Sequence, residues 1–379
     1  MPAPVRRIAL ALLSFALAFV AARLRLSYAD PLAKAAEAAM YSTDSSLPVA
    51  LYSEALRRDD ASPYRWADLA EALAANGRIA DAQRCFERAL VLAPGVPQIW
   101  VRHANFCFLH DQPAPALQSA ARVLDCVPDY DSVLFHDFDQ MLSRPAEIDA
   151  ALAHSPRALR SWLGHLIAIN EPAAARLAWT QIMSAGDGEA AIASAYTDYL
   201  IRNQSWPEAI AAWSQWLGPR RGDYPGRNLL FNGRFDQAPS RGSLDWRVGE
   251  NSEFFETVRE APGMRIHFEG KANLDYNQLS QIAVLPAPGH YRLSARVRSD
   301  GLTTNEGPRL AITDLGLETE SVTGTHDWMP LTIEFSTAKA RAIRVAVIRR
   351  PSLKFDNKIA GTFWVSDVTL APLFRPSGL

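Results

Sequence analysis

The stretch that decides the fold reads Asn228-Leu-Leu-Phe-Asn-Gly-Arg-Phe-Asp236 and is followed by Leu244-Asp-Trp246. Upstream of it the apolar residues recur at helical spacing, and downstream of it they alternate with the period of a strand. The Asn232-Gly233 pair predicts a tight turn, because both residues tolerate a positive φ. The chain is therefore expected to be helical before this stretch and β-rich after it, with Asn228–Asp236 in its opening strand.

The helical half repeats itself at an offset of 34 residues. This offset superposes Trp66 on Trp100, Ala70 on Ala104, Ala82 on Ala116 and Pro94 on Pro128. Within Pro63–Gly95, the order of large, small and helix-ending positions resembles the tetratricopeptide repeat. The resemblance implies helix pairs that bury their apolar faces only by stacking on neighbours.

About five helical pairs are expected. A partial pair comes first, and a weaker copy over Pro97–Pro128 has His103 at the leucine position of the repeat. The segment Asp131–Ser155 holds 25 residues instead of 34, which predicts a degenerate third pair. Two further pairs begin near Pro156 and Ala190.

Such a solenoid usually holds a protein or peptide segment on its concave face. The residues expected to point toward that face are Tyr64, Glu71, Gln98 and Asn105. They form no charged clamp, so the alternative is that they are ordinary solvated positions.

The residues between the last helical pattern and the first strand pattern are rich in Gly, Pro and charge, as at a domain boundary. The expected domains are a targeting segment at 1–27, a helical solenoid at 28–218, a linker at 219–227 and a β-sandwich at 228–379. The fold class is thus α plus β in separate domains.

Six runs of period-2 alternation after the linker predict an antiparallel sandwich. Several ordered blocks there are similar to galactose-binding-like jelly rolls, and more narrowly to carbohydrate-binding modules: Asn228–Asp236, Leu244–Trp246, Leu279–Ile282, Pro288–Arg298, Thr325–Trp328 and Gly361–Leu370. The resemblance implies that one face of the sandwich contacts polysaccharide. Other domains of this shape bind no sugar or only hold neighbouring domains together.

Alternation assigns the candidate glycan face. If Tyr291, Leu293 and Val297 point into the core, the arginines between them point outward. The candidate ligand-binding residues are Arg265, His267, Tyr276, Asn277, Arg292, Arg296, Arg298 and Arg344. Guanidinium groups suit carboxylate or sulfate ligands. The alternative is a solvated strand that guards a sheet edge.

The resemblance also assigns two structural features. Trp246 and Trp328 match positions that plug the core in the family, whereas Trp364 alternates with buried positions and is expected to be exposed or to pack between domains. Asp236 and Asp367 match the places of a structural calcium. Two carboxylates fall short of the six to eight oxygens that calcium takes, unless backbone carbonyls contribute.

Composition excludes several classes of protein. Lys+Arg number 39 against 41 Asp+Glu, without a dense basic run, which argues against nucleic-acid binding. The cysteines Cys85, Cys107 and Cys126 make neither a zinc site nor a disulfide framework and are expected to be buried. The sequence contains none of the common catalytic motifs, so a non-catalytic protein is expected.

The N-terminus has the layout of an export signal: Arg6 and Arg7, an uncharged run over Ile8–Ala22, then Arg23 and Arg25. As a helix the run would span about 22 Å, short of the roughly 30 Å hydrocarbon core. A cleaved signal peptide and a short inner-membrane anchor both fit. In either case the remainder is expected in the periplasm or facing it from the membrane.

These features predict an exported protein in which the repeats dock a protein and the sandwich contacts glycan, in a bacterial envelope or exopolysaccharide assembly or export system. Two alternatives stay open. The chain could be a purely structural scaffold that binds no sugar, or an accessory subunit of a glycan hydrolase.

Overall fold

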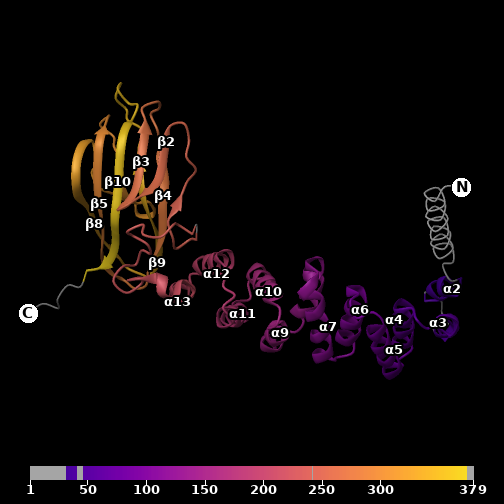
Figure 1. Ribbon diagram of the computed structural model, residues 1–379. Helices are drawn as coiled ribbons and strands as arrows, with labels where there is room; N and C mark the ends of the chain where they lie inside the picture. The colour runs from indigo at the N-terminus through magenta and orange to yellow at the C-terminus, as the bar shows by residue number, and fades with distance from the viewer. Residues whose placement is uncertain (1–30, 41–45, 241, 374–379) are drawn as a thin grey trace, which may run out of the picture. The chain divides into compact units, whose positions relative to one another are not determined.

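A computed structural model describes residues 31–40, 46–240 and 242–373 (Figure 1). The predicted targeting segment at 1–27 lies outside these residues. Contacts divide the chain into two compact units, Met1–Ser161 and Trp162–Leu379. The domain boundaries drawn from the sequence remain predictions. In the ranges that the structure describes, no helix combines the length and apolar character needed to cross a bilayer.

The first half of the chain is helical, as predicted. Its α-helices are α2 (Pro31–Ala39), α3 (Ser46–Arg58), α4 (Pro63–Ala75), α5 (Ile79–Leu92), α6 (Pro97–Leu109), α7 (Pro113–Cys126), α8 (Asp131–Asp139), α9 (Pro145–Leu152), α10 (Pro156–Ala168), α11 (Pro172–Ala185), α12 (Ala190–Arg202) and α13 (Trp206–Leu217). Short 3-10 turns follow α7 and α13, at η1 (Pro128–Tyr130) and η2 (Gly218–Arg221).

The pair α4 and α5 shows why the repeat forms. The Ser62 hydroxyl accepts a hydrogen bond from the backbone N–H of Arg65 at 3.4 Å and caps α4. Ala70 and Ala82 are fully buried where the two helices pack closely. Gly77, at φ +72°, adopts the left-handed conformation that ends the first helix. The predicted helix pair is confirmed.

The degenerate pair is also confirmed, because α8 and α9 have only 9 and 8 residues. The prediction for the cysteines is correct for Cys85 and Cys107, which are buried. It is wrong for Cys126, the last residue of α7, which is exposed.

The second half of the chain forms two five-stranded antiparallel sheets, as predicted for a sandwich. Sheet A has the order β1-β4-β9-β6-β7 and sheet B the order β2-β3-β10-β5-β8. The strands are β1 (Arg247–Val248), β2 (Phe255–Glu260), β3 (Gly263–Glu269), β4 (Tyr276–Leu285), β5 (Gly289–Leu302), β6 (Arg309–Ile312), β7 (Leu317–Glu318), β8 (Gly324–Thr337), β9 (Arg341–Arg349) and β10 (Ala360–Pro372), with a 3-10 turn η3 (Thr313–Leu315) after β6.

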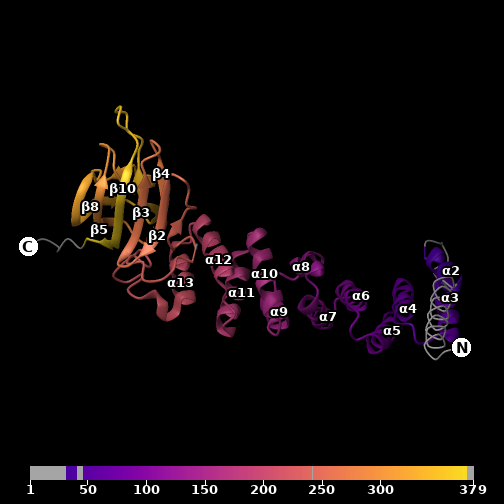
Figure 2. The same cartoon turned by 45° about the horizontal axis from the view of Figure 1, so that its top comes forward.

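Sheet B contains the central strand of the fold. Figures 1 and 2 show β10 between β3 and β5, so the last strand of the chain lies in the middle of the sheet. Along β5 the residues alternate between buried and exposed, with Leu293 and Val297 in the core. Across the sheet, Trp364 of β10 stands opposite Arg298 of β5.

The prediction that Asn228–Asp236 forms the opening strand is wrong, because this stretch contains no strand. It does precede the first strand of the sandwich. It forms consecutive turns beside β10, where the N–H of Leu229 donates to the carbonyl of Leu370 at 2.8 Å. Asn232 has the expected positive φ, at 54°. Gly233 is required for another reason, because a Cβ there would lie 1.9 Å from the carbonyl oxygen of Val368.

The last helix shares a core with the sandwich. Trp213 and Leu217 of α13 are buried in one cluster with Phe231, Leu244 and Val284 of β4. Helix α13 therefore packs against the β-sandwich and shares its hydrophobic core.

Candidate functional site

The outer face of sheet B gathers most of the predicted glycan-binding residues. Arg265 and His267 come from β3, and Arg292, Arg296 and Arg298 come from β5. The three arginines of β5 are exposed, because they alternate with buried neighbours. Five of the eight predicted residues therefore lie on one surface.

Two arginines of this surface stack on tryptophans. The guanidinium carbon of Arg298 lies 4.9 Å from the ring centroid of Trp364, and that of Arg296 lies 5.4 Å from the ring centroid of Trp328. The indole N–H of Trp364 donates to a carboxylate oxygen of Glu260 at 3.0 Å. We call Arg296, Arg298, Trp328 and Trp364 the Trp–Arg face.

The prediction that Trp328 lies in the core is wrong, and the structure shows where Trp364 lies. Trp328 is not a core residue, because it is only half-buried on β8 and stacks with Arg296. Trp364 is half-buried on the outer side of β10, as its alternation with Phe363 and Val365 suggested. Trp246 is fully buried beside Phe235, as predicted.

Carboxylates neutralise part of the basic surface. Arg265 lies 2.6 Å from Glu256 and 2.8 Å from Glu260, and Arg292 lies 2.7 Å from Glu334. Among the described residues, no carboxylate oxygen lies within 4.0 Å of the Arg298 guanidinium. Arg298 is therefore the arginine of this face most available to a ligand.

Three predicted residues lie elsewhere. Tyr276 is fully buried, and its hydroxyl oxygen is 2.9 Å from the hydroxyl of Thr257. Burial raises the pKa of the Tyr276 phenol, and a side chain in this position cannot contact a ligand. Asn277 on β4 and Arg344 on β9 belong to sheet A, away from the arginines of β5.

Asp236 and Asp367 share an arginine, and a calcium ion at these two residues remains a prediction. The Nε of Arg234 lies 3.7 Å from a carboxylate oxygen of Asp236 and 3.7 Å from one of Asp367. A guanidinium thus supplies the positive charge between these two carboxylates. The described part of the chain contains no group of three or more His, Cys, Asp or Glu residues arranged to hold a metal ion.

The four residues predicted for the repeat groove are exposed. Tyr64 and Glu71 lie on α4, and Gln98 and Asn105 lie at equivalent positions of α6. That they line a concave binding face remains a prediction.

An ion-pair network joins α4 and α6, which sequence reasoning missed. Arg102 of α6 bonds Asp68 at 2.8 Å and Glu71 at 2.6 Å. Burial raises the pKa of the Asp68 carboxyl, and the bond to Arg102 opposes this effect. The equivalence of residues 34 positions apart could have suggested that Asp68 and Arg102 lie on neighbouring helices.

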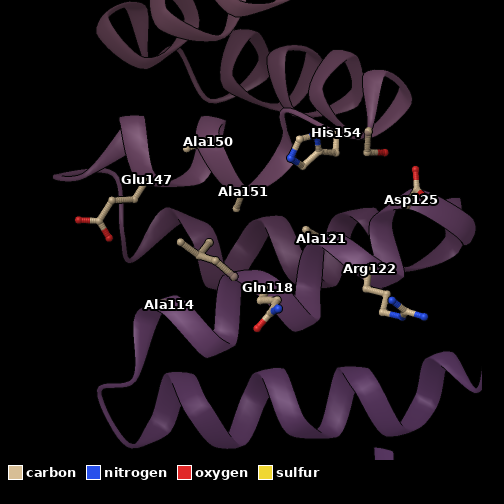
Figure 3. A pocket seen from close by; sticks show the side chains of 11 residues that line it. Ala114, Gln118, Ala121, Arg122, Asp125, Glu147, Ala150, Ala151 and His154 are labelled. Carbon is tan, nitrogen blue, oxygen red and sulfur yellow. The ribbon is translucent and has the colours of Figure 1, made fainter. Parts of the chain in front are cut away.

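The helical unit also contains an apolar cavity of about 730 Å³ between α7 and α9. Figure 3 shows Ala114, Gln118 and Ala121 on α7 facing Ala150 and Ala151 on α9 across it. The short α9 packs against the longer α7, and small side chains line both helices.

Comparison with known proteins agrees with this architecture. Residues 65–106 match the tetratricopeptide repeat family. No curated protein matches the chain.

Solved structures of two kinds are among those that resemble parts of the chain. A structure from the functional characterisation of pilF from Pseudomonas aeruginosa is 16% identical, covering 52% of this chain and 92% of that one at a TM-score of 0.29. A CBM4 structure is 14% identical over 38% of this chain and 99% of its own length, with a TM-score of 0.28. TmCBM61, solved with β-1,4-galactotriose, is 20% identical over 39% of this chain and 100% of its own, with a TM-score of 0.25.

The class of the protein follows from its two parts. Helical repeats, of which residues 65–106 match the tetratricopeptide repeat family, precede a sandwich of two five-stranded antiparallel sheets.

Proposed function

We propose that this chain is a non-catalytic binding protein whose sandwich binds polysaccharide on the Trp–Arg face while its helical repeats hold a protein partner. The observation that carries the proposal is the stacking of Arg298 on Trp364 and of Arg296 on Trp328 on one outer face of sheet B. Two half-buried tryptophans on one outer face, each with an arginine beside its ring, offer flat aromatic surface together with hydrogen-bond donors.

The stacking suits a carbohydrate ligand. A guanidinium that stacks on a ring through its flat face keeps the N–H donors at its edges available for hydroxyl or carboxylate oxygens. Trp364 and Trp328 stand on strands two apart, with β5 between them, which separates them by roughly 10 Å. That separation is comparable to the length of two pyranose rings.

The protein-docking part of the proposal rests on the repeats. The network of Arg102 with Asp68 and Glu71 fixes charged groups across two successive helix pairs. A peptide lying along α4 and α6 would meet these groups together with Tyr64 and Asn105.

The cellular setting is inferred from the sequence. The run Ile8–Ala22 between arginine pairs supports export, with the folded part in the periplasm or held at the membrane facing it. The pairing of a protein-docking solenoid with a glycan-binding sandwich suits a bacterial envelope or exopolysaccharide system.

A glycan array probed with the whole chain tests the proposal. The isolated sandwich is a poor reagent, because Trp213 and Leu217 of α13 share its core. We expect retention on at least one acidic polysaccharide. A lack of retention on every acidic and neutral polymer would favour the purely structural scaffold, and release of reducing ends by the purified chain would favour a role in glycan hydrolysis.

A further inference from the structure

A second cavity, of about 430 Å³, lies within the unit that begins at Trp162. Segments distant in the sequence enclose it: residues 220–237, which lead from η2 into the opening turns, and Asp367–Thr369 of β10. We call it the junction pocket. Four arginines line it: Arg220, Arg221, Arg227 and Arg234.

The charges of the junction pocket are unevenly paired. Arg234 forms ion pairs with Asp236 and Asp367. Asp367 also lies 3.5 Å from Arg296 of the Trp–Arg face. Arg220 stacks on Trp216, with its guanidinium carbon 4.5 Å from the ring centroid.

Arg221 and Arg227 are exposed at the pocket, and no carboxylate oxygen among the described residues lies within 4.0 Å of either guanidinium. The four arginines that line the pocket outnumber its three aspartates, Asp223, Asp236 and Asp367, by one. The pocket therefore attracts anions.

The backbone around the pocket is held in place by side-chain amides. Asn232 donates to the carbonyl of Gln237 at 2.8 Å and accepts from its N–H at 3.1 Å. Gln237 in turn donates to the carbonyl of Arg220 at 2.8 Å. A wall fixed in this way needs little ordering when a ligand binds.

We propose that the junction pocket binds the carboxylate of an acidic sugar, with Arg221 and Arg227 as its principal donors. This inference rests on the proposed function and specifies the polymer as one that carries uronate residues. Guanidinium forks match the planar carboxylate group with two parallel hydrogen bonds. Because Asp367 joins Arg234 to Arg296, a glycan chain on the Trp–Arg face can place a carboxylate in the pocket.

Calorimetric titration of the full chain tests this assignment. The probes are glucuronic acid, glucose as its neutral match, and inorganic phosphate as another oxyanion. We expect glucuronic acid to bind at least about tenfold more tightly than glucose or phosphate. The double variant Arg221→Ala/Arg227→Ala should weaken glucuronic acid binding about tenfold or more with an unchanged melting temperature, since both side chains are exposed.

Arg202→Ala is the matched control, because Arg202 is an exposed arginine of the same unit outside the pocket. Its binding of glucuronic acid should equal that of the wild type. Equal affinity for glucose, tighter binding of phosphate, or an unaffected double variant would each overturn the assignment.

The variant Trp364→Ala separates this inference from the proposed function. It should lose retention on polymer yet keep its affinity for glucuronic acid. Binding of glucuronic acid without any retention of polymer would contradict the proposed function alone, and retention of polymer without binding of glucuronic acid would contradict the junction pocket alone.

Discussion

The backbone N–H of Leu370 donates a hydrogen bond of 2.9 Å to the side-chain oxygen of Asn228. The same oxygen accepts from the N–H of Leu230 at 3.0 Å, and the Asn228 amide donates to the carbonyl of Val368 at 3.0 Å. One side chain thus ties the first turn of the sandwich to its last strand.

Asn228→Ala should lower the free energy of unfolding by about 3 kcal/mol, because three backbone groups lose their partner. Urea denaturation followed by circular dichroism measures the change. Asn277→Ala is the control, because Asn277 is exposed and its side-chain oxygen accepts a hydrogen bond from the side chain of its neighbour Gln278 at 3.1 Å. A control that loses as much stability as Asn228→Ala would show that the bonds of Asn228 are not the cause.

The alternation of apolar and polar residues predicted part of the candidate site on sheet B. It failed where the pairing of two strands is irregular. Trp364 could be placed because it lies between Phe363 and Val365, both buried in regular alternation. Trp328 could not, because the pairing of β5 with β8 shifts register between Val297 and Ser299, which breaks the alternation.

Contacts between residues far apart in the sequence could not be predicted either. The sequence predicts Tyr276 just before a strand, as a ring at the edge of the ligand cleft, but it begins β4 and its hydroxyl contacts Thr257 on β2 in the other sheet. The junction pocket brings residues 220–237 beside Asp367, a contact that no local spacing encodes. The helix pairs of the repeat, by contrast, could be predicted, because they are local and periodic.

Arg349 offers a second test of stability. It is fully buried and donates to the carbonyls of Glu306 and Asn357 and to the side-chain oxygen of Asn273, each at 3.0 Å. It also donates to the carbonyl of Leu274. Burial lowers the pKa of this guanidinium.

Arg349→Met should cost about 3 kcal/mol or more, because several buried acceptors lose their donor. Arg349→Lys should not restore stability, since one ammonium cannot reproduce the planar fork. The neighbouring Arg350→Met is the control. Arg350 is paired with Glu318 at 3.0 Å with a side-chain exposure of 61%, so its loss should cost about 0–1 kcal/mol. Equal losses at both positions, measured by urea denaturation, would refute the anchoring role of Arg349.

The burial of His103 predicts that the stability of the protein depends on pH. Its ring is buried, with Nδ1 2.8 Å from the hydroxyl of Ser119, and burial lowers its pKa below the ordinary 6.5. The unfolded chain therefore takes up a proton at pH values where the folded chain does not. Stability should fall as the pH drops below 6.5 toward the lower pKa of the folded state.

His103→Leu should reduce the loss of melting temperature between about pH 7.5 and about pH 5, because the titrating group is removed. His136→Leu replaces a histidine with a side-chain exposure of 81% and should keep the wild-type dependence. An unaltered dependence in His103→Leu would assign the effect to other groups.

The most direct test of the account compares two tryptophan variants by affinity electrophoresis of the full chain in gels containing an acidic polysaccharide. Trp364→Ala removes one ring of the Trp–Arg face. Trp100→Ala removes a ring of the helical repeats that also carries an arginine, Arg122, at 5.0 Å. We predict that retardation by the polymer is lost in Trp364→Ala and kept in Trp100→Ala. Equal retardation of both variants would contradict carbohydrate binding on the Trp–Arg face.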